Sequence, residues 1–156
     1  MAELDYFVNF LNELPDVALK IATEATKVTI DKEKAKLQNF LIYNSGSEKL
    51  NNQMIVTKID DNNSYGYVID WSNQKVNPSP TRKYVRRKVI KRAKGKRNYS
   101  IAPATYHDLA WILNYGTEKK VGNYFITRGV RRLKGLDRRI ESQFRKDIAA
   151  EIQKRT

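Results

Sequence analysis

The residues best suited to acid–base chemistry in this sequence are His107 and its neighbours Tyr106 and Asp108. A hydrolytic site needs a nucleophile, a base beside it and an acid that orients the base. His107 is the only histidine. Adjacent residues on a strand point to opposite faces, so Asp108 is poorly placed to orient it there. The sequence therefore predicts a structural or solvated histidine, and a protein that is not an enzyme.

The sequence also lacks the motifs of a metal site or a phosphate-binding loop. The Asp60-Asp61-Asn62 cluster lacks the central glycine and distal glutamate of a calcium loop. The chain has no cysteine, which excludes disulfides and thiolate metal ligands. Its glycines are scattered, and none begins a Gly-Lys-Ser or Gly-Lys-Thr phosphate loop. We expect no cofactor and no metal ion.

Charge is the strongest feature of the composition. Of the net charge of +13, +11 lies between Trp71 and His107, where there is no Asp or Glu. A second cluster, from Arg128 to Arg139, carries +5, which leaves −3 for the rest of the chain. A nearly neutral body with two basic patches predicts an anionic partner for the patches.

The larger patch forms a basic arm, about 72–98, which we expect to be exposed and mobile because a run of like charges resists packing. Two conformations fit it: a helix with Val85, Val89 and Ala93 on one face, or an edge hairpin with Gly95 near its tip. Tyr84 and Tyr99 interleave its charges, a pattern that suits nucleic acid. Its candidate contact residues are Arg82, Lys83, Arg86, Arg87, Lys88, Lys91, Arg92, Lys94, Lys96 and Arg97.

The elements around these residues follow from hydrophobic periodicity. Apolar residues from Leu4 to Leu14 recur at helical spacing, and Pro15 separates this short helix from a longer one that bends near Asp31. Alternation predicts strands at 54–59 and 65–71, joined by an Asp- and Asn-rich turn, and a further strand at 99–102. Both helical stripes are expected to cover the sheet; the alternatives are an interaction face for the N-terminal stripe and a subunit contact for the C-terminal stripe.

The C-terminal part is a strong amphipathic helix, because Leu136, Ile140, Phe144, Ile148 and Ile152 recur every four residues. We therefore expect one α+β domain, 1–156. It would have a small antiparallel β-sheet packed by a long N-terminal helix and this C-terminal helix, with a long basic loop. No apolar run approaches the roughly 20 residues of a membrane span. The acidic N-terminus lacks the basic region of a signal peptide.

The stretch from Leu109 to Val130 organises the chain. An apolar block, Leu109 to Leu113, ends in the turn Asn114-Tyr115-Gly116-Thr117, and a polar loop leads to Tyr124-Phe125 and a basic helical part. This order resembles the tail-completion (minor tail, head–tail joining) proteins of long-tailed bacteriophages. Asn114 stands where that family usually has Glu, and Asn123-Tyr124 replaces its usual Arg-Pro.

The resemblance implies a structural virion-assembly protein that acts at the head–tail junction through protein–protein contacts. Its partners would be other neck and tail proteins, and further copies of itself in a ring. It would be found in the host cytoplasm during assembly and then in the virion. Tyr115, Gly116, Thr117 and Phe125 would be fold determinants, and the basic arm a partner- or subunit-binding segment. The alternative is a non-catalytic nucleic-acid-binding protein that uses the basic arm.

Overall fold

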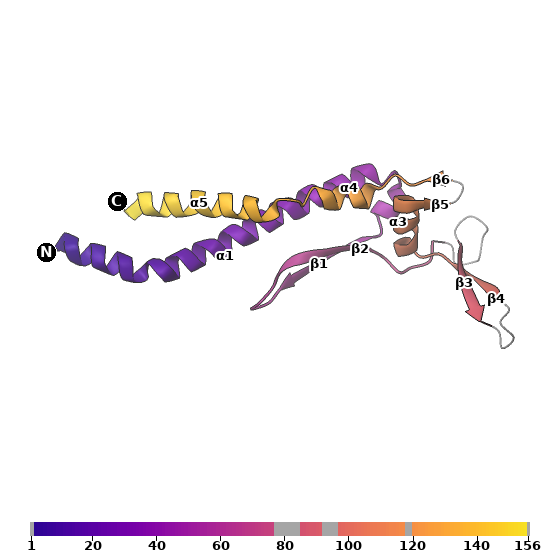
Figure 1. Cartoon of the computed structure of the whole chain (residues 1–156), viewed down its shortest axis with the longest axis horizontal. Coiled ribbons are helices and arrows are strands. Elements are labelled where there is room, and N and C mark those ends of the chain that lie inside the picture. The colour runs from indigo at the N-terminus through magenta and orange to yellow at the C-terminus, as the bar shows by residue number, and fades with distance from the viewer. Residues whose placement is uncertain (1, 77–84, 92–96, 118–119, 156) are drawn as a thin grey trace. The chain divides into compact units, whose positions relative to one another are not determined.

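The computed structural model describes residues 2–76, 85–91, 97–117 and 120–155, and gives the strands at 85–91 and 97–103 by their backbone (Figure 1). Helices and strands are mixed, which confirms the α+β class. The chain forms two compact units. The helical unit comprises Met1–Lys36, Asp60–Gly66 and Leu133–Thr156, and the mixed unit comprises Leu37–Ile59 and Tyr67–Arg132. The expectation of a single domain, 1–156, stays a prediction.

Helix α1 spans Ala2–Asn44 without a break at Pro15. The expected pair of helices, separated at Pro15, is therefore wrong. Proline removes one backbone hydrogen bond but does not necessarily end a helix whose other contacts hold it. Those contacts come from α5 (Leu136–Arg155), where Arg155 pairs with Glu13 at 3.5 Å and stacks over Phe10 at 5.4 Å.

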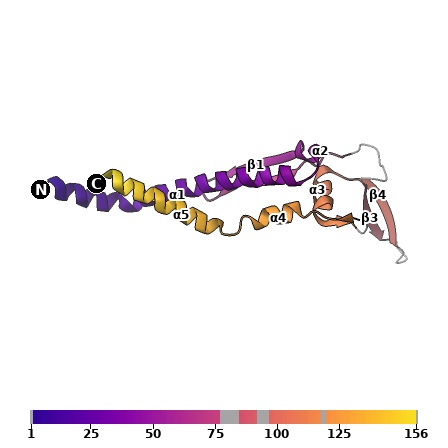
Figure 2. The same cartoon turned by 90° about the horizontal axis from the view of Figure 1, so that it is seen from above.

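The C-terminal helix α5 forms as the sequence predicts, but its apolar stripe does not cover a sheet. It lies beside α1 in the helical unit (Figures 1 and 2). The two helices run antiparallel, because Arg139 near one end of α5 pairs with Glu33 at 3.3 Å while Arg155 pairs with Glu13. Hydrogen bonds to Glu151 and then Glu13 raise the pKa of Arg155. No residue of α5 is buried.

The mixed unit contains the last part of α1 and most of the shorter elements, except for Asp60 of β1 and Tyr65 and Gly66 of β2, which belong to the helical unit. The shorter elements are α2 (Glu48–Asn51), β1 (Met54–Asp60), β2 (Tyr65–Trp71), β3 (Val85–Lys91), β4 (Arg97–Pro103), α3 (Tyr106–Tyr115), β5 (Gly116–Thr117), β6 (Lys120–Val121) and α4 (Phe125–Arg131). The described strands form three separate two-stranded sheets, β1–β2, β3–β4 and β5–β6. The small antiparallel sheet expected from the sequence is therefore confirmed as the β1–β2 hairpin, and two further two-stranded sheets accompany it.

The turn of the β1–β2 hairpin uses its carboxylates for folding. Asp61 Oδ1 accepts hydrogen bonds from the backbone nitrogens of Asn63 and Ser64, at 2.9 and 2.6 Å. Asp60 lies 3.9 Å from the ammonium of Lys27. Among the described residues, no group of three His, Asp or Glu side chains is placed to hold a metal ion.

The segment before the Tyr-Gly-Thr turn is a helix, α3, so the strand geometry assumed for His107 and Asp108 is wrong. A capping box begins the helix: Thr105 Oγ1 accepts from the Asp108 nitrogen at 3.1 Å, and Asp108 Oδ2 accepts from the Thr105 nitrogen at 3.2 Å. Such a box satisfies two backbone donors that a helix start leaves free. The pattern Thr-x-x-Asp was the signal for a helix in the sequence.

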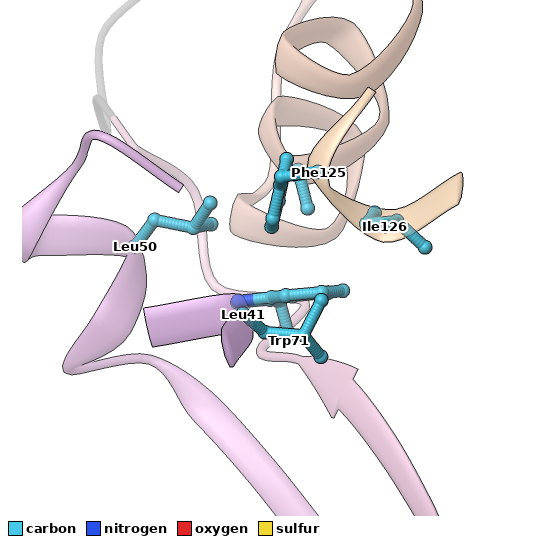
Figure 3. Close-up of a cluster of buried hydrophobic side chains, with 6 residues drawn as sticks. Leu41, Leu50, Trp71, Phe125 and Ile126 are labelled. Atoms are coloured by element: carbon cyan, nitrogen blue, oxygen red, sulfur yellow. The ribbon is translucent and has the colours of Figure 1, made fainter. Parts of the chain in front are cut away.

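The hydrophobic core of the mixed unit brings five elements together. Its buried members are Leu41 of α1, Leu50 of α2, Trp71 of β2, Ala110 of α3, and Phe125 and Ile126 of α4 (Figure 3). The rings of Trp71 and Phe125 meet edge to face, with centroids 5.9 Å apart. Burying each large side chain contributes about 1.5–3 kcal/mol, so this cluster anchors the turn that follows α3.

Candidate interaction sites

Asn114 joins α3 to α4 at the centre of the mixed unit. Its side chain is fully buried in the last turn of α3. The Oδ1 atom accepts hydrogen bonds from the backbone nitrogens of Ile126 (2.9 Å) and Thr127 (3.1 Å), and Nδ2 donates to Thr127 Oγ1 at 3.0 Å. The N-cap residue of α4, Tyr124, makes no side-chain hydrogen bond to the start of the helix. Asn114 instead accepts hydrogen bonds from the free backbone N–H groups there.

Two glycines let the backbone cross itself beside Asn114. Gly116 has a φ of +82°, and a Cβ there would overlap the backbone nitrogen of Gly122 and the carbonyl oxygen of Lys120. A Cβ on Gly122 would overlap the carbonyl oxygen of Asn114. Both positions therefore require glycine. The sequence singled out Gly116, but Gly122 and the role of Asn114 were missed, because their partners lie in other segments.

The four residues proposed as fold determinants have different surroundings. Phe125 is fully buried in the core, and Gly116 lies at the close backbone approach. Thr117 is exposed, and so is Tyr115, at 61% of its surface. The structure thus gives a packing role to Phe125 and Gly116, and leaves Tyr115 on the surface.

A row of rings lies along one face of α3. His107, Trp111 and Tyr115 are spaced four residues apart. The rings of Trp111 and Tyr115 stack with centroids 5.6 Å apart and an interplanar angle of 15°, and His107 meets Trp111 at 6.5 Å. This exposed aromatic pair was not foreseen from the sequence.

His107 does have an orienting carboxylate, from another element than its neighbour Asp108. Its Nδ1 lies 2.6 Å from Asp70 Oδ1 on β2. The side chains of this pair are 39% and 49% exposed. Among the described residues no hydroxyl is hydrogen-bonded to the His107 ring, so the pair lacks the nucleophile of a hydrolytic triad. The expectation of a non-enzyme stays a prediction.

The described part of the basic arm is a β-hairpin. Strands β3 and β4 pair antiparallel from Val85–Pro103 to Lys91–Arg97. At the base of the arm, Lys75 bridges Thr105, and the Val76 nitrogen donates to Ala104 O at 3.0 Å. The hairpin interpretation is therefore confirmed for these residues, and a helix through Val85 and Val89 is wrong.

The ten candidate contact residues of the arm divide between described and undescribed segments. Five of them lie outside the described residues: Arg82, Lys83, Arg92, Lys94 and Lys96. Gly95 and the segment expected to be mobile around it also lie outside the described residues. The paired strands hold Arg86, Arg87, Lys88, Lys91 and Arg97. We call β3 and β4 together the basic hairpin.

Part of the second basic cluster is engaged inside its own unit. In the mixed unit, the guanidinium groups of Arg128 and Arg132 lie over the ring of Phe40, at 5.7 and 4.7 Å from its centroid. In the helical unit, Arg139 pairs with Glu33. The guanidinium groups stack on a ring or pair with a carboxylate, so three of these charges already have partners.

The helical unit buries few apolar side chains fully, and one face of α1 stays exposed. Ala25 is the only buried hydrophobic residue among its described side chains. Leu4, Val8, Leu11 and Leu19 are each 46–68% exposed. Spacings of three, four and eight residues, with Pro15 between, place them on one face of α1, which we call the α1 stripe.

The α1 stripe lies away from the face that contacts α5. That other face carries Phe10 and Glu13, which touch Arg155. The two helices are also separated by an open groove of about 430 Å³. The groove is lined by Val17, Lys20, Ile21 and Glu24 of α1 and by Asp147, Ala150, Glu151, Lys154 and Arg155 of α5. The pair of helices therefore has little core of its own.

Comparisons with protein-family models, with curated proteins and with solved structures find no match. Across the described residues, no helix combines the length and apolar character needed to cross a membrane. The functional assignment therefore rests on the site geometry and on the sequence resemblance.

Proposed function

We propose that this protein is a structural virion-assembly protein of a tailed bacteriophage or prophage, which acts at the head–tail junction through protein–protein contacts. The observation that carries the proposal is the α1 stripe, whose four apolar side chains are each 46–68% exposed. An exposed apolar helix face is typical of a surface that another chain covers.

The bacteriophage assignment draws on the resemblance at Leu109 to Val130. The turn at Gly116, the buried Phe125 and the basic helical part that follows fit that resemblance. On this proposal the chain has no catalytic role. It would assemble in the host cytoplasm, as a ring, and remain in the neck or tail of the virion.

The test uses a phage or prophage that encodes this chain, with the gene deleted. We expect separate filled heads and complete tails, seen by electron microscopy, and joined particles when the wild-type protein is supplied in trans. Joined particles at normal yield without the gene would overturn the proposal.

A charge-reversed chain shows whether the basic hairpin takes part in joining. Arg86→Glu, Arg87→Glu and Lys88→Glu together should fail to restore joining while the circular dichroism spectrum stays that of the wild type. The matched control is Lys32→Glu, Lys49→Glu and Lys146→Glu, which changes the net charge equally at exposed positions. The control should restore joining; equal restoration by both variants would exclude a role for the hairpin.

A second candidate function, nucleic-acid binding, is favoured by the basic hairpin and by the exposed stack of Trp111 on Tyr115. About six phosphate contacts would give a slope near −5 in a plot of log affinity against log salt on duplex DNA. Purified protein that retards DNA at physiological salt with such a slope would favour this function. Protein that leaves DNA unretarded would exclude it.

A further inference from the structure

The end of α1 that carries the α1 stripe is acidic. From Ala2 to Leu19 the helix has four carboxylates and no Lys or Arg, so its side-chain charge is −4. The neighbouring end of α5, Asp147 to Arg155, has two carboxylates and two bases and adds nothing to this charge. Asp5 and Asp16 are exposed, and their spacing of eleven residues places them along one edge of the stripe.

The negative charge around the α1 stripe limits which surfaces can bind there. Pairing the stripe with the same stripe of another copy would bring two acidic segments together, and like charges across an interface cost several kcal/mol. The occupant should instead be basic, with apolar side chains among its charges.

The basic hairpin of the same chain has this composition. Strand β3 reads Val-Arg-Arg-Lys-Val-Ile-Lys, so Val85, Val89 and Ile90 stand among four bases. Residues 82–97 hold ten bases and no carboxylate. The other basic cluster is a weaker candidate, because Arg128, Arg132 and Arg139 already have partners within their units.

We propose that the α1 stripe of one copy binds the basic hairpin of a second copy. The two surfaces differ, so the contact is head to tail, and its repetition can close into a ring. This inference rests on the proposed function in one respect only, that such a ring stands at the head–tail junction. Exposed charge pairs are screened by salt, so the assembly should dissociate as the salt concentration rises.

A charge swap tests the pairing in the full-length protein. The stripe variant carries Asp5→Lys and Asp16→Lys, and the hairpin variant carries Arg87→Glu and Lys88→Glu. The mass in solution is measured by light scattering after size exclusion, over a range of protein concentrations at low and high salt. We expect the wild type to form oligomers at low salt, and each variant to need on the order of tenfold more protein to do so.

Two further samples decide whether the surfaces meet each other. The chain with all four substitutions has the net charge of the wild type and should recover the wild-type mass. An equimolar mixture of the two variants should also assemble, because each supplies the charge that the other lacks. Circular dichroism controls for folding, and the uncharged variant Leu4→Ser with Leu11→Ser should lose assembly at every salt concentration.

Three results would overturn the inference. The first is a wild-type protein that stays monomeric at every protein concentration and every salt concentration. This result would overturn the inference even if the α1 stripe binds the hairpin of its own chain or another protein. The second is an oligomer that neither variant weakens. The third is a failure of both the four-fold variant and the mixture to recover assembly. In each case the head–tail joining assay still reports on the proposed function separately.

Discussion

Asn114 is the residue on which the junction between α3 and α4 depends. Its carboxamide is buried and satisfies the backbone nitrogens of Ile126 and Thr127. Replacing Asn114 by Ala leaves buried donors without acceptors, which costs about 1–3 kcal/mol for each such group. We expect Asn114→Ala to lower the free energy of unfolding by about 2–3 kcal/mol, measured by urea unfolding followed by tryptophan fluorescence, to which buried Trp71 contributes.

Two companion variants separate hydrogen bonding from the loss of side-chain volume. Asn114→Asp keeps the accepting oxygen at the start of α4, where a negative charge is favourable, so its loss should be smaller. Asn9→Ala, at an exposed position of α1, should change stability by less than about 0.5 kcal/mol. A similar small change for Asn114→Ala would contradict the role assigned to this side chain.

The crossing of the backbone at Gly116 gives a second prediction. Gly116→Ala places a Cβ against the backbone of Gly122 at a positive φ, so we expect a loss of more than about 2 kcal/mol in the free energy of unfolding. Gly66→Ala is the matched control, because a Cβ there would meet no atom within 4 Å beyond its chain neighbours, and the φ of Gly66 is not positive. Equal losses in thermal or urea unfolding would refute the requirement at Gly116.

Among single residues, those that could be predicted from the sequence are the ones recognisable from their immediate neighbours in the chain. Gly116 was recognisable from its turn, and Phe125 was singled out through the family resemblance. Asn114 was noted as a departure from a family pattern, but its hydrogen bonds reach residues 12 and 13 positions away. Asp70 was not connected with His107, since the two lie 37 positions apart.

At the scale of elements, the helical unit and the mixed unit differ in how their helices are held. Helix α5 has no buried residue, whereas α3 buries Leu109, Ala110 and Asn114. Helices with few buried apolar contacts open locally at low free energy. We therefore expect the amides of α5 to exchange with deuterium faster than those of α3, measured by mass spectrometry on monomeric protein.

Assembly should slow hydrogen–deuterium exchange most strongly in the α1 stripe. If the α1 stripe is covered by a second copy, the amides of 4–19 should become protected as the protein concentration rises. If the amides of α5 exchange as slowly as those of α3 in the monomer, the view that the helical unit has little core of its own would be contradicted.

Elements were predictable where a single periodicity dominates. The four-residue repeat of α5 and the alternation of β1 and β2 are such cases, and all three elements form as expected. Helix α3 was missed because its apolar run is short and its capping box was not used. The continuity of α1 through Pro15 was missed because the effect of proline was judged locally, whereas α1 also contacts α5 through Phe10 and Glu13.

At the scale of the whole molecule, both the charge distribution and the exposed apolar surface favour contacts between copies of the chain. The net charge of +13 is concentrated in segments of the mixed unit and at the start of α5, while the first part of α1 is acidic. A chain with opposite charges on different surfaces favours ordered contacts between copies over random aggregation. On the proposed function, such contacts would build part of a larger particle.

The most direct test of the proposed function is the position of this chain in the purified virion. A phage whose copy of the gene carries a short epitope tag would be purified, labelled with gold-conjugated antibody and viewed by electron microscopy. We expect gold at the junction between head and tail, and a fixed number of copies per particle by quantitative mass spectrometry. Particles that lack the chain, or that carry it elsewhere than the neck and tail, would contradict the proposal.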